Sequence, residues 1–382
     1  MKLFHLSDLH IGLKLVNRDL YEDQKYIFNQ ICDYVRTEQP DAVVIAGDIY
    51  DKSIPSAEAV ELFDQFVMGL TDAAPNASIM MISGNHDSAQ RVNCYRDILA
   101  KQNVHMIGMP PSGENESIEK VVLQDAYGNV NFYLLPFVKP SMVKSLVGVD
   151  EKGNNLSYND TVKILLERET IDDSERNVIV SHQFYLPNGG QADDIERMDS
   201  EIVTVGNIDA VSSKILEVFD YAALGHIHKP MKAGSEFIRY CGTPLACSVS
   251  EAGQKKGIIV VELYEKGNRD IRVLPLSPMR QVRIIEGTLE EVLKQASNDY
   301  VTVILTDKID LDIVDMQDRI RAAFPNILEI RRELPRKADY SKTVVQEENL
   351  SPFELCCGFL KITDSIDQAL LQDVIHTVQG VK

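Results

Sequence analysis

The sequence predicts a layered α/β fold. Short apolar or β-branched runs, typical of buried strands, recur along the chain, and segments with the helical spacing of apolar residues lie between them. Each run ends directly before a polar cluster, and ligand sites in such sheets gather beyond the carboxyl ends of strands. The strand-like runs are residues 3–6, 42–46, 78–83, 178–181 and 221–224.

Two long helices and further strands complete this prediction. Residues 19–38 carry apolar side chains at helical spacing, and residues 55–70 do the same, with Pro55 suited to the first turn after Ser53. Alternation of apolar and polar residues within 115–137 and 236–275 indicates antiparallel strands, which we expect to complete a second sheet.

The composition changes near residues 275–278, which we interpret as a domain boundary. Residues 281–331 then show a β-α-β-α-β pattern typical of a small separate domain. A polar linker is predicted at 337–349, followed by two short amphipathic helices at 352–359 and 366–378 that are too small to hold a core alone. This tail either docks on a partner or packs back on its own chain. The predicted division is 1–277, 278–336 and 337–382.

Composition indicates a cytoplasmic protein without membrane association. No apolar stretch approaches the roughly 20 residues that span a bilayer, and the N-terminus lacks the pattern of a signal peptide. The six cysteines show no metal-binding spacing, so we expect reduced, partly buried side chains; the alternative is a redox or metal-binding role.

The formal charge of −19 argues against strong unaided binding of a nucleic acid, because Lys and Arg supply most of the affinity for phosphates. It does not exclude an enzyme whose metal ions bind the scissile phosphate and whose partner protein binds the nucleic-acid backbone. The basic stretch 331–337 is either a solvated loop or a phosphate contact.

The polar clusters contain a set of candidate metal ligands. Carboxylate, amide and neutral imidazole suit Mn²⁺, Fe or Zn²⁺, and there are enough of them for two ions that share one carboxylate. In Asp8-Leu9-His10, the spacing at the end of a strand places both side chains on one side. The candidates are Asp8, His10, Asp48, Asp51, Asn85, His86, His182, His226 and His228.

Several candidates have an expected role. Gly47 permits a sharp turn at the end of its strand, and Asp48, which follows it, is the natural carboxylate to bridge two cations. Asn85 offers a neutral amide oxygen as a further ligand. His86 is placed to protonate a leaving oxygen, with a carboxylate such as Asp51 or Asp87 fixing its tautomer. Each residue alone also fits a capped turn or a satisfied core position; the ordered set favours a metal site. His5, His105 and His376 lie outside these clusters.

Five motifs follow one another within about residues 1–275: Asp-x-His, Gly-Asp-x-x-Asp, Gly-Asn-His-Asp, His and Gly-His-x-His. This order resembles that of the calcineurin-like metallophosphoesterases. The stretches 5–15, 40–63 and 82–88 further resemble the SbcD nuclease subunits of bacterial SbcCD complexes. The resemblance implies a four-layer α/β/β/α sandwich with a small α+β capping domain. It also implies that the tail, from Leu350, docks on the coiled coil of an SbcC-type ATPase.

Carried over to this sequence, the resemblance implies two Mn²⁺ ions, with Mg²⁺, Fe or Zn²⁺ as alternatives. Asp8, His10, Asp48 and His228 would hold one ion, and Asp48, Asn85, His182 and His226 the other. His86 would be the acid, oriented by Asp51. The expected activity is exonuclease and endonuclease action on DNA ends, single strands or hairpins. The resemblance also implies a homodimer within a heterotetramer, formed through helices expected at 55–70 and 88–100.

Two rival functions stay open. A phosphomonoesterase or cyclic-nucleotide phosphodiesterase of the same fold would use the same ligands, although it has no need of a capping region and tail. A non-catalytic module that binds the ATPase and tethers it to DNA is the second rival.

Overall fold

The computed structural model describes residues 1–187, 190, 195, 197–201, 208–307 and 313–332, and six positions beyond residue 352. The chain divides into two compact units, Met1–Glu333 and Leu334–Lys382. The predicted linker at 337–349 lies outside the described residues, as do His376 and nearly all of the predicted tail helices.

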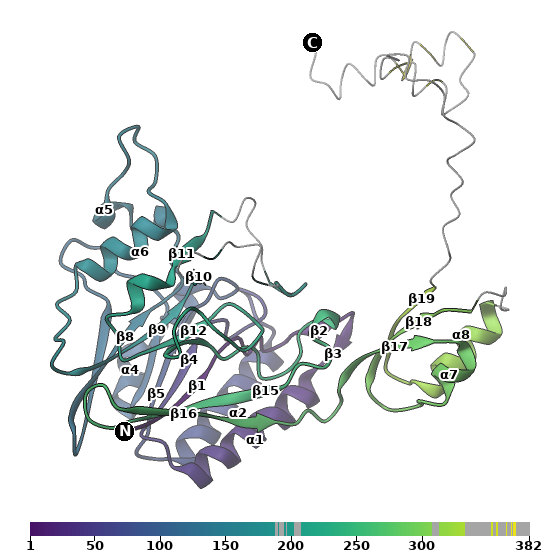
Figure 1. The fold of residues 1–382 in the computed structure, drawn as a ribbon, viewed down its shortest axis with the longest axis horizontal. Helices are drawn as coiled ribbons and strands as arrows, with labels where there is room; N and C mark the ends of the chain where they lie inside the picture. The colour runs from purple at the N-terminus through teal and green to yellow at the C-terminus, as the bar shows by residue number, and fades with distance from the viewer. Residues whose placement is uncertain are drawn as a thin grey trace. The chain divides into compact units, whose positions relative to one another are not determined.

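Two six-stranded mixed sheets form the centre of the first unit (Figure 1). In each sheet, four neighbouring strands are parallel, and antiparallel strands complete one edge of the first sheet and both edges of the second. The first sheet runs in the order β16 (Arg269–Leu276), β15 (Lys256–Leu263), β1 (Lys2–Leu6), β4 (Ala42–Ala46), β5 (Ser78–Ile82) and β6 (Val104–Ile107). The second runs β13 (Met231–Lys232), β14 (Ile238–Tyr240), β12 (Tyr221–Gly225), β9 (Arg176–His182), β8 (Gly128–Leu135) and β7 (Glu119–Asp125).

Alternate side chains of the buried strands face two different layers, as the period of two along a strand requires. On β4, Val43 and Ile45 pack in the core beneath α1 (Tyr21–Glu38) and α2 (Ala57–Ala73), whereas Val44 packs between the two sheets. On β9, Ile179 lies in the core that includes α6 (Tyr158–Glu167), and Val180 faces the first sheet. The four-layer α/β/β/α arrangement is therefore confirmed.

The assignment of strands to sheets differs from the sequence prediction. The antiparallel pair β15 and β16 joins β1 in the first sheet, whereas β9 and β12 lie in the second sheet with β7 and β8. A strand buried on both faces reads as a continuous apolar run, so its sequence does not identify its neighbours.

Two helix predictions also need correction. Helix α2 begins at Ala57, with the hydroxyl of Ser56 accepting from the amide of Ala59 at 3.3 Å, so Pro55 precedes the helix. Residues 88–100 form two short helices, α3 (Ala89–Val92) and α4 (Arg96–Leu99), instead of one. The break falls at Tyr95, whose φ of 62° is left-handed and incompatible with a continuing helix.

Residues beyond 281 form a parallel three-stranded sheet of β17 (Val282–Gly287), β18 (Tyr300–Leu305) and β19 (Ile327–Arg332) with α7 (Leu289–Leu293) and α8 (Ile313–Ala323). These elements have a core of their own around Val292, Val303 and Ile320. Shorter elements are β2 (Lys14–Leu15), β3 (Arg18–Asp19), β10 (Phe184–Leu186), β11 (Ala210–Ser212) and α5 (Lys144–Val147). None of the helices in the described part of the chain is long and apolar enough to cross a membrane.

Candidate metal centre

Five strand ends, three from the first sheet and two from the second, bring the predicted side chains together. Strands β1, β4 and β5 are parallel neighbours, so the loops that follow them emerge at one edge. Strands β9 and β12 are parallel with His182 opposite Gly225, which places His182 beside the loop that carries His226 and His228.

The backbone of these loops is strained. Asp8, His10, Asp48 and His226 all have positive φ angles, of 53°, 43°, 50° and 102°. Such conformations in residues other than glycine are uncommon and cluster at functional sites. Gly47 has a φ of 89°, and a Cβ there would lie 2.3 Å from Nδ1 of His182, so only glycine fits this strand exit.

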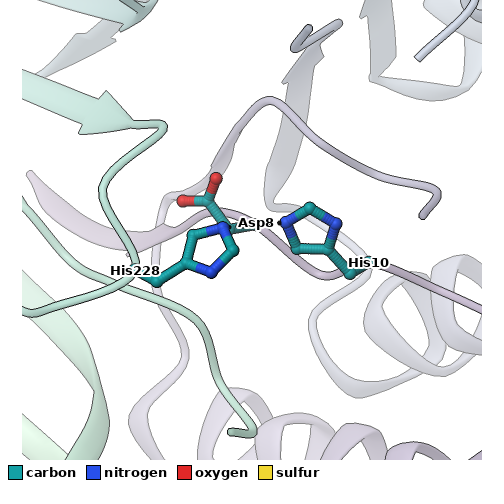
Figure 2. A group of neighbouring side chains, drawn as sticks. All are labelled: Asp8, His10 and His228. Carbon is teal, nitrogen blue, oxygen red and sulfur yellow. Dashed lines mark hydrogen bonds between the residues drawn. The ribbon is translucent and has the colours of Figure 1, made fainter. Parts of the chain in front are cut away.

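Asp8, His10 and His228 form the first group of ligand atoms, which we call the Asp8 half. All three side chains are buried and face one another (Figure 2), and their ligand atoms lie within 4.8 Å. The Nε2 atoms of His10 and His228 are 3.0 Å apart. The Asp8 carboxylate is fixed by the amide of His226, which donates to it at 3.0 Å.

Asp48, Asn85, His182 and His226 form the second group, which we call the His182 half. Oδ1 of Asn85 lies 2.9 Å from Nε2 of His182 and 2.8 Å from Nδ1 of His226. Oδ2 of Asp48 is 3.3 Å from Nε2 of His182 and 3.7 Å from Nε2 of His10. Asp48 therefore lies between the two halves.

The donor set fits a metal ion. Nδ1 of His182 is 2.7 Å from the carbonyl oxygen of Ala46, so it carries the hydrogen and Nε2 of the neutral ring has a lone pair. That lone pair faces the oxygens of Asn85 and Asp48, which are also acceptors. Several buried acceptors pointing at one place require a cation between them, either a proton on the ring or a metal ion.

The charges of the isolated protein agree with this requirement. Burial alone would lower the pKa of His182, but the Asp48 and Asp8 carboxylates raise it to about 9. Burial opposes ionisation of Asp48, yet the neighbouring His182 and His10 hold its pKa well below the usual range. Burial lowers the pKa of His10 and of His226 well below 6.5, which favours the neutral imidazole that a metal requires.

His86 and Asp51 lie beside the two halves. Nδ1 of His86 is 3.0 Å from the backbone carbonyl of Asp51, so this carbonyl, and not the expected carboxylate, sets the orientation of the ring. The Asp51 carboxylate instead lies 3.9 Å from Nδ1 of His10. The Asp87 carboxylate accepts from the amides of Ile49, Tyr50 and Gly84 and ties the loops after β4 and β5 together.

Sequence patterns did not reveal a set of buried polar residues around His228. Glu251 and Lys256 form a buried ion pair at 2.6 Å, and Glu251 is 3.4 Å from Nδ1 of His228. Glu201 accepts from the amide of His228 at 2.9 Å. These residues have no ligand-like spacing in the chain and meet His228 only in the folded protein.

His5, which was predicted to lie in the first strand and outside the site, has a hydrogen-bond partner at each ring nitrogen. Nδ1 of His5 lies 2.9 Å from the Tyr221 hydroxyl, and Nε2 lies 3.1 Å from the carbonyl oxygen of Leu224. Burial lowers the pKa of His5 to about 3, so the ring is neutral. His105 lies in β6. Among the cysteines that the structure describes, all are free: Cys32, Cys94, Cys241, Cys247 and Cys357.

The comparison with known proteins identifies the family. The family model described as Calcineurin-like phosphoesterase matches residues 1–230, more than half of the chain. The curated SbcD subunit of the nuclease SbcCD from Staphylococcus epidermidis is 32% identical over 336 residues, which cover 86% of this chain and 84% of that protein. The chain belongs to the SbcD family. A member of this family with the ligand cluster described above is a metal-dependent hydrolase.

Further matches agree with the SbcD assignment. The protein of the same name from Staphylococcus saprophyticus is 32% identical over 296 residues, 77% of this chain and 74% of that protein. A second family model, described as Type 5 capsule protein repressor C-terminal domain, matches residues 277–363. A solved dimetal phosphatase from Danio rerio aligns with a TM-score of 0.42 and 16% identity, over 72% of this chain and 99% of that one, and the assignment does not rest on it.

Proposed function

We propose that this SbcD-family chain is a Mn²⁺-dependent DNA exonuclease and endonuclease that hydrolyses phosphodiester bonds with two ions. It acts as the nuclease subunit of a complex with an SbcC-type ATPase in DNA repair and recombination. The observation that carries the proposal is the position of Asp48, whose carboxylate lies within 3.7 Å of imidazole nitrogens from both halves of the centre.

In this proposal Asp8, His10, Asp48 and His228 hold one ion, and Asp48, Asn85, His182 and His226 hold the other. The mixture of carboxylate, amide and imidazole suits Mn²⁺, with Mg²⁺, Fe and Zn²⁺ as alternatives. Two such ions supply Lewis-acid activation of a water and of the scissile phosphate.

The chain itself supplies the proton for the leaving oxygen. Donation of Nδ1–H of His86 to the Asp51 carbonyl directs Nε2 away from that loop, and the Asp48 carboxylate accepts from the His86 amide at 2.8 Å. The ring is therefore oriented through Nδ1, and the main chain of His86 is fixed beside the Asp48 carboxylate. A protonated Nε2 positioned in this way gives its proton to the departing oxygen.

Two clefts that share Asp51 adjoin the proposed site. A cleft of about 360 Å³ is lined by His10, Asp51 and Arg331, and a cleft of about 680 Å³ is lined by Asp51, Lys14 and Lys52. Asp51 lines both clefts, which supports a substrate that extends beyond one phosphate. Each cleft also carries further carboxylates, Asp199 and Glu329 in the smaller and Asp19 and Glu58 in the larger. Because the formal charge is −19, these few cations need help from the partner to hold DNA.

We extend the proposal to assembly. Residues 278–336 act as a capping domain, and residues 337–382 dock on the coiled coil of the ATPase. A homodimer within a heterotetramer would use α2 and the segment 88–100, where Met68, Tyr95 and Ile98 are 57%, 76% and 64% exposed. The assembly would act in the cytoplasm, at the nucleoid.

The proposal is tested with purified chain and Mn²⁺, alone and with the ATPase. Labelled duplex ends, single strands and hairpins should be cleaved, and His86→Gln should abolish most of the cleavage. Efficient hydrolysis of p-nitrophenyl phosphate or cyclic nucleotides with DNA left intact would favour the small-substrate rival. Undiminished nuclease activity of the complex with Asp48→Ala would favour the non-catalytic module.

A further inference from the structure

His228 is held at every polar atom except the one that faces the metal centre. Its amide donates to Glu201 at 2.9 Å, and its carbonyl accepts from Nζ of Lys256 at 3.2 Å. Nδ1 lies 2.7 Å from Oγ of Ser200 and 3.4 Å from Oε1 of Glu251. Nε2 is left to face Asp8 and His10.

The direction of these hydrogen bonds fixes the tautomer of His228. Oε1 of Glu251 accepts from the Ser200 hydroxyl at 2.9 Å. Because a serine has one hydroxyl hydrogen and it is used here, Oγ of Ser200 must accept from Nδ1 of His228. The hydrogen of the ring is therefore on Nδ1, and the lone pair of Nε2 points into the Asp8 half.

Glu251 is held in turn by a dense set of donors. It is 1% exposed, and its Oε2 accepts from Lys256 at 2.6 Å and from the Thr243 hydroxyl at 2.9 Å. The amide of Cys247 donates to Oε1 at 3.2 Å. The carboxylate thus has one fixed position, and it transmits that position to His228 through Ser200.

The other imidazoles are anchored differently. His182 donates to the main-chain carbonyl of Ala46, and Nδ1 of His10 has no hydrogen-bond partner among the described residues. A carboxylate partner makes an imidazole a stronger ligand, and loss of such a partner typically lowers metal affinity about 10- to 100-fold.

We propose that Glu251, acting through Ser200, is a positioning residue that sets the metal affinity of the Asp8 half without touching the ion. This inference rests on the proposed two-ion centre. The competing explanation is that Glu251 only neutralises the buried charge of Lys256.

The test is titration of the full-length chain with Mn²⁺, following the electron paramagnetic resonance signal of the free ion. The double variant Glu251→Met/Lys256→Met replaces both members of the ion pair, so neither charge is left buried without its partner. We expect one equivalent to bind as in the wild type and the other about 10- to 100-fold more weakly. Ser200→Ala should weaken the same equivalent while leaving the Glu251–Lys256 pair in place.

Two controls separate positioning from general damage. Asp220→Asn removes a buried carboxylate that pairs with Lys266 at 2.8 Å, at the start of β12 and away from the centre, and should leave both equivalents unchanged. In a His228→Gln background, Ser200→Ala should have no further effect on binding, because the residue that it positions is gone.

The outcomes are distinguishable. Wild-type affinity for both equivalents in Ser200→Ala, or equal weakening of both, would overturn the role of Glu251. Fewer than two equivalents in the wild type would instead overturn the proposed two-ion centre. Circular dichroism shows whether the double variant folds. If it does not, Ser200→Ala and the double-mutant cycle that combines it with His228→Gln test the positioning role of Glu251.

Discussion

The two halves of the metal centre are built in different ways. In the His182 half, the key imidazole is the last residue of β9 and is anchored to the main chain of β4 in the other sheet, at Ala46. In the Asp8 half, His228 lies in a loop and is anchored by the side chains of Ser200 and Glu251. Main-chain anchoring follows from the sheets themselves, whereas side-chain anchoring needs residues from distant parts of the chain.

The largest expected effect comes from removing what the halves share. Asp48→Asn keeps the shape of the side chain but removes the charge between the two groups of imidazoles. Hydrolysis should fall by more than about 10,000-fold, beyond the usual contribution of acid–base catalysis alone, since the proposed pair of ions loses the negative charge between them. Single-turnover cleavage of a duplex end measures this loss, and a variant retaining a tenth of the activity would show that Asp48 is not shared.

His86→Gln should lower cleavage by about 100- to 1,000-fold while both halves still bind metal, because in the proposed mechanism His86 protonates the leaving oxygen and holds no ion. Parallel activity assays and Mn²⁺ titrations separate the two effects. With bis(p-nitrophenyl) phosphate, whose leaving group needs no proton, the loss should largely disappear. An equal loss with both substrates, or loss of a metal equivalent, would contradict this role.

Gly225→Ala disturbs the hydrogen bond between His182 and the Ala46 carbonyl, which anchors the His182 half to the main chain. A Cβ at this position would lie 1.9 Å from the Ala46 carbonyl oxygen and 2.8 Å from Nδ1 of His182. Such overpacking typically lowers the free energy of unfolding by about 1–3 kcal/mol. We expect a lower melting temperature and weaker binding of one Mn²⁺.

Gly113→Ala is the control for this substitution, because the atoms nearest to its Cβ belong to the flexible side chain of Glu116, at 3.3 Å. Its melting temperature and metal binding should match the wild type. Wild-type values for Gly225→Ala as well would show that the anchor tolerates displacement.

The smallest effect is a pH dependence of metal binding to the His182 half. His182 has a pKa of about 9, so below that pH its proton competes with the ion. The affinity of the His182 half for its metal ion should rise about tenfold per pH unit between pH 7.5 and 9 and then level off. Below pH 9, His182 should release one proton for each ion bound. Calorimetry in two buffers of different ionisation enthalpy counts that proton, and no release at pH 8 would contradict the raised pKa.

The difference between the halves also explains what the sequence could predict. Asp8, Asp48 and Asn85 each follow an apolar run, and the ends of parallel strands meet at one edge, so their proximity was predictable. The sheet to which β9 and β12 belong was not, because their uniformly apolar runs carry no information on neighbours. Glu251 and Lys256 were missed because the contacts that define their role exist only in three dimensions.

The contact between Asp51 and His86 differs from the expected one for a related reason. A sequence shows the Asp51 carboxylate but not the direction of its carbonyl, and the carbonyl makes the contact. The start of α2 was misplaced because Ser53 and Ser56 are both suitable caps, and only the folded loop selects Ser56.

The most direct test of the shared two-ion centre is an anomalous-scattering map of a crystal soaked in Mn²⁺. We predict two peaks in each chain, about 3.5–4 Å apart, with the Asp48 carboxylate contacting both and Asp8 and His182 on opposite sides. A single peak, or two peaks that Asp48 does not touch, would contradict the account.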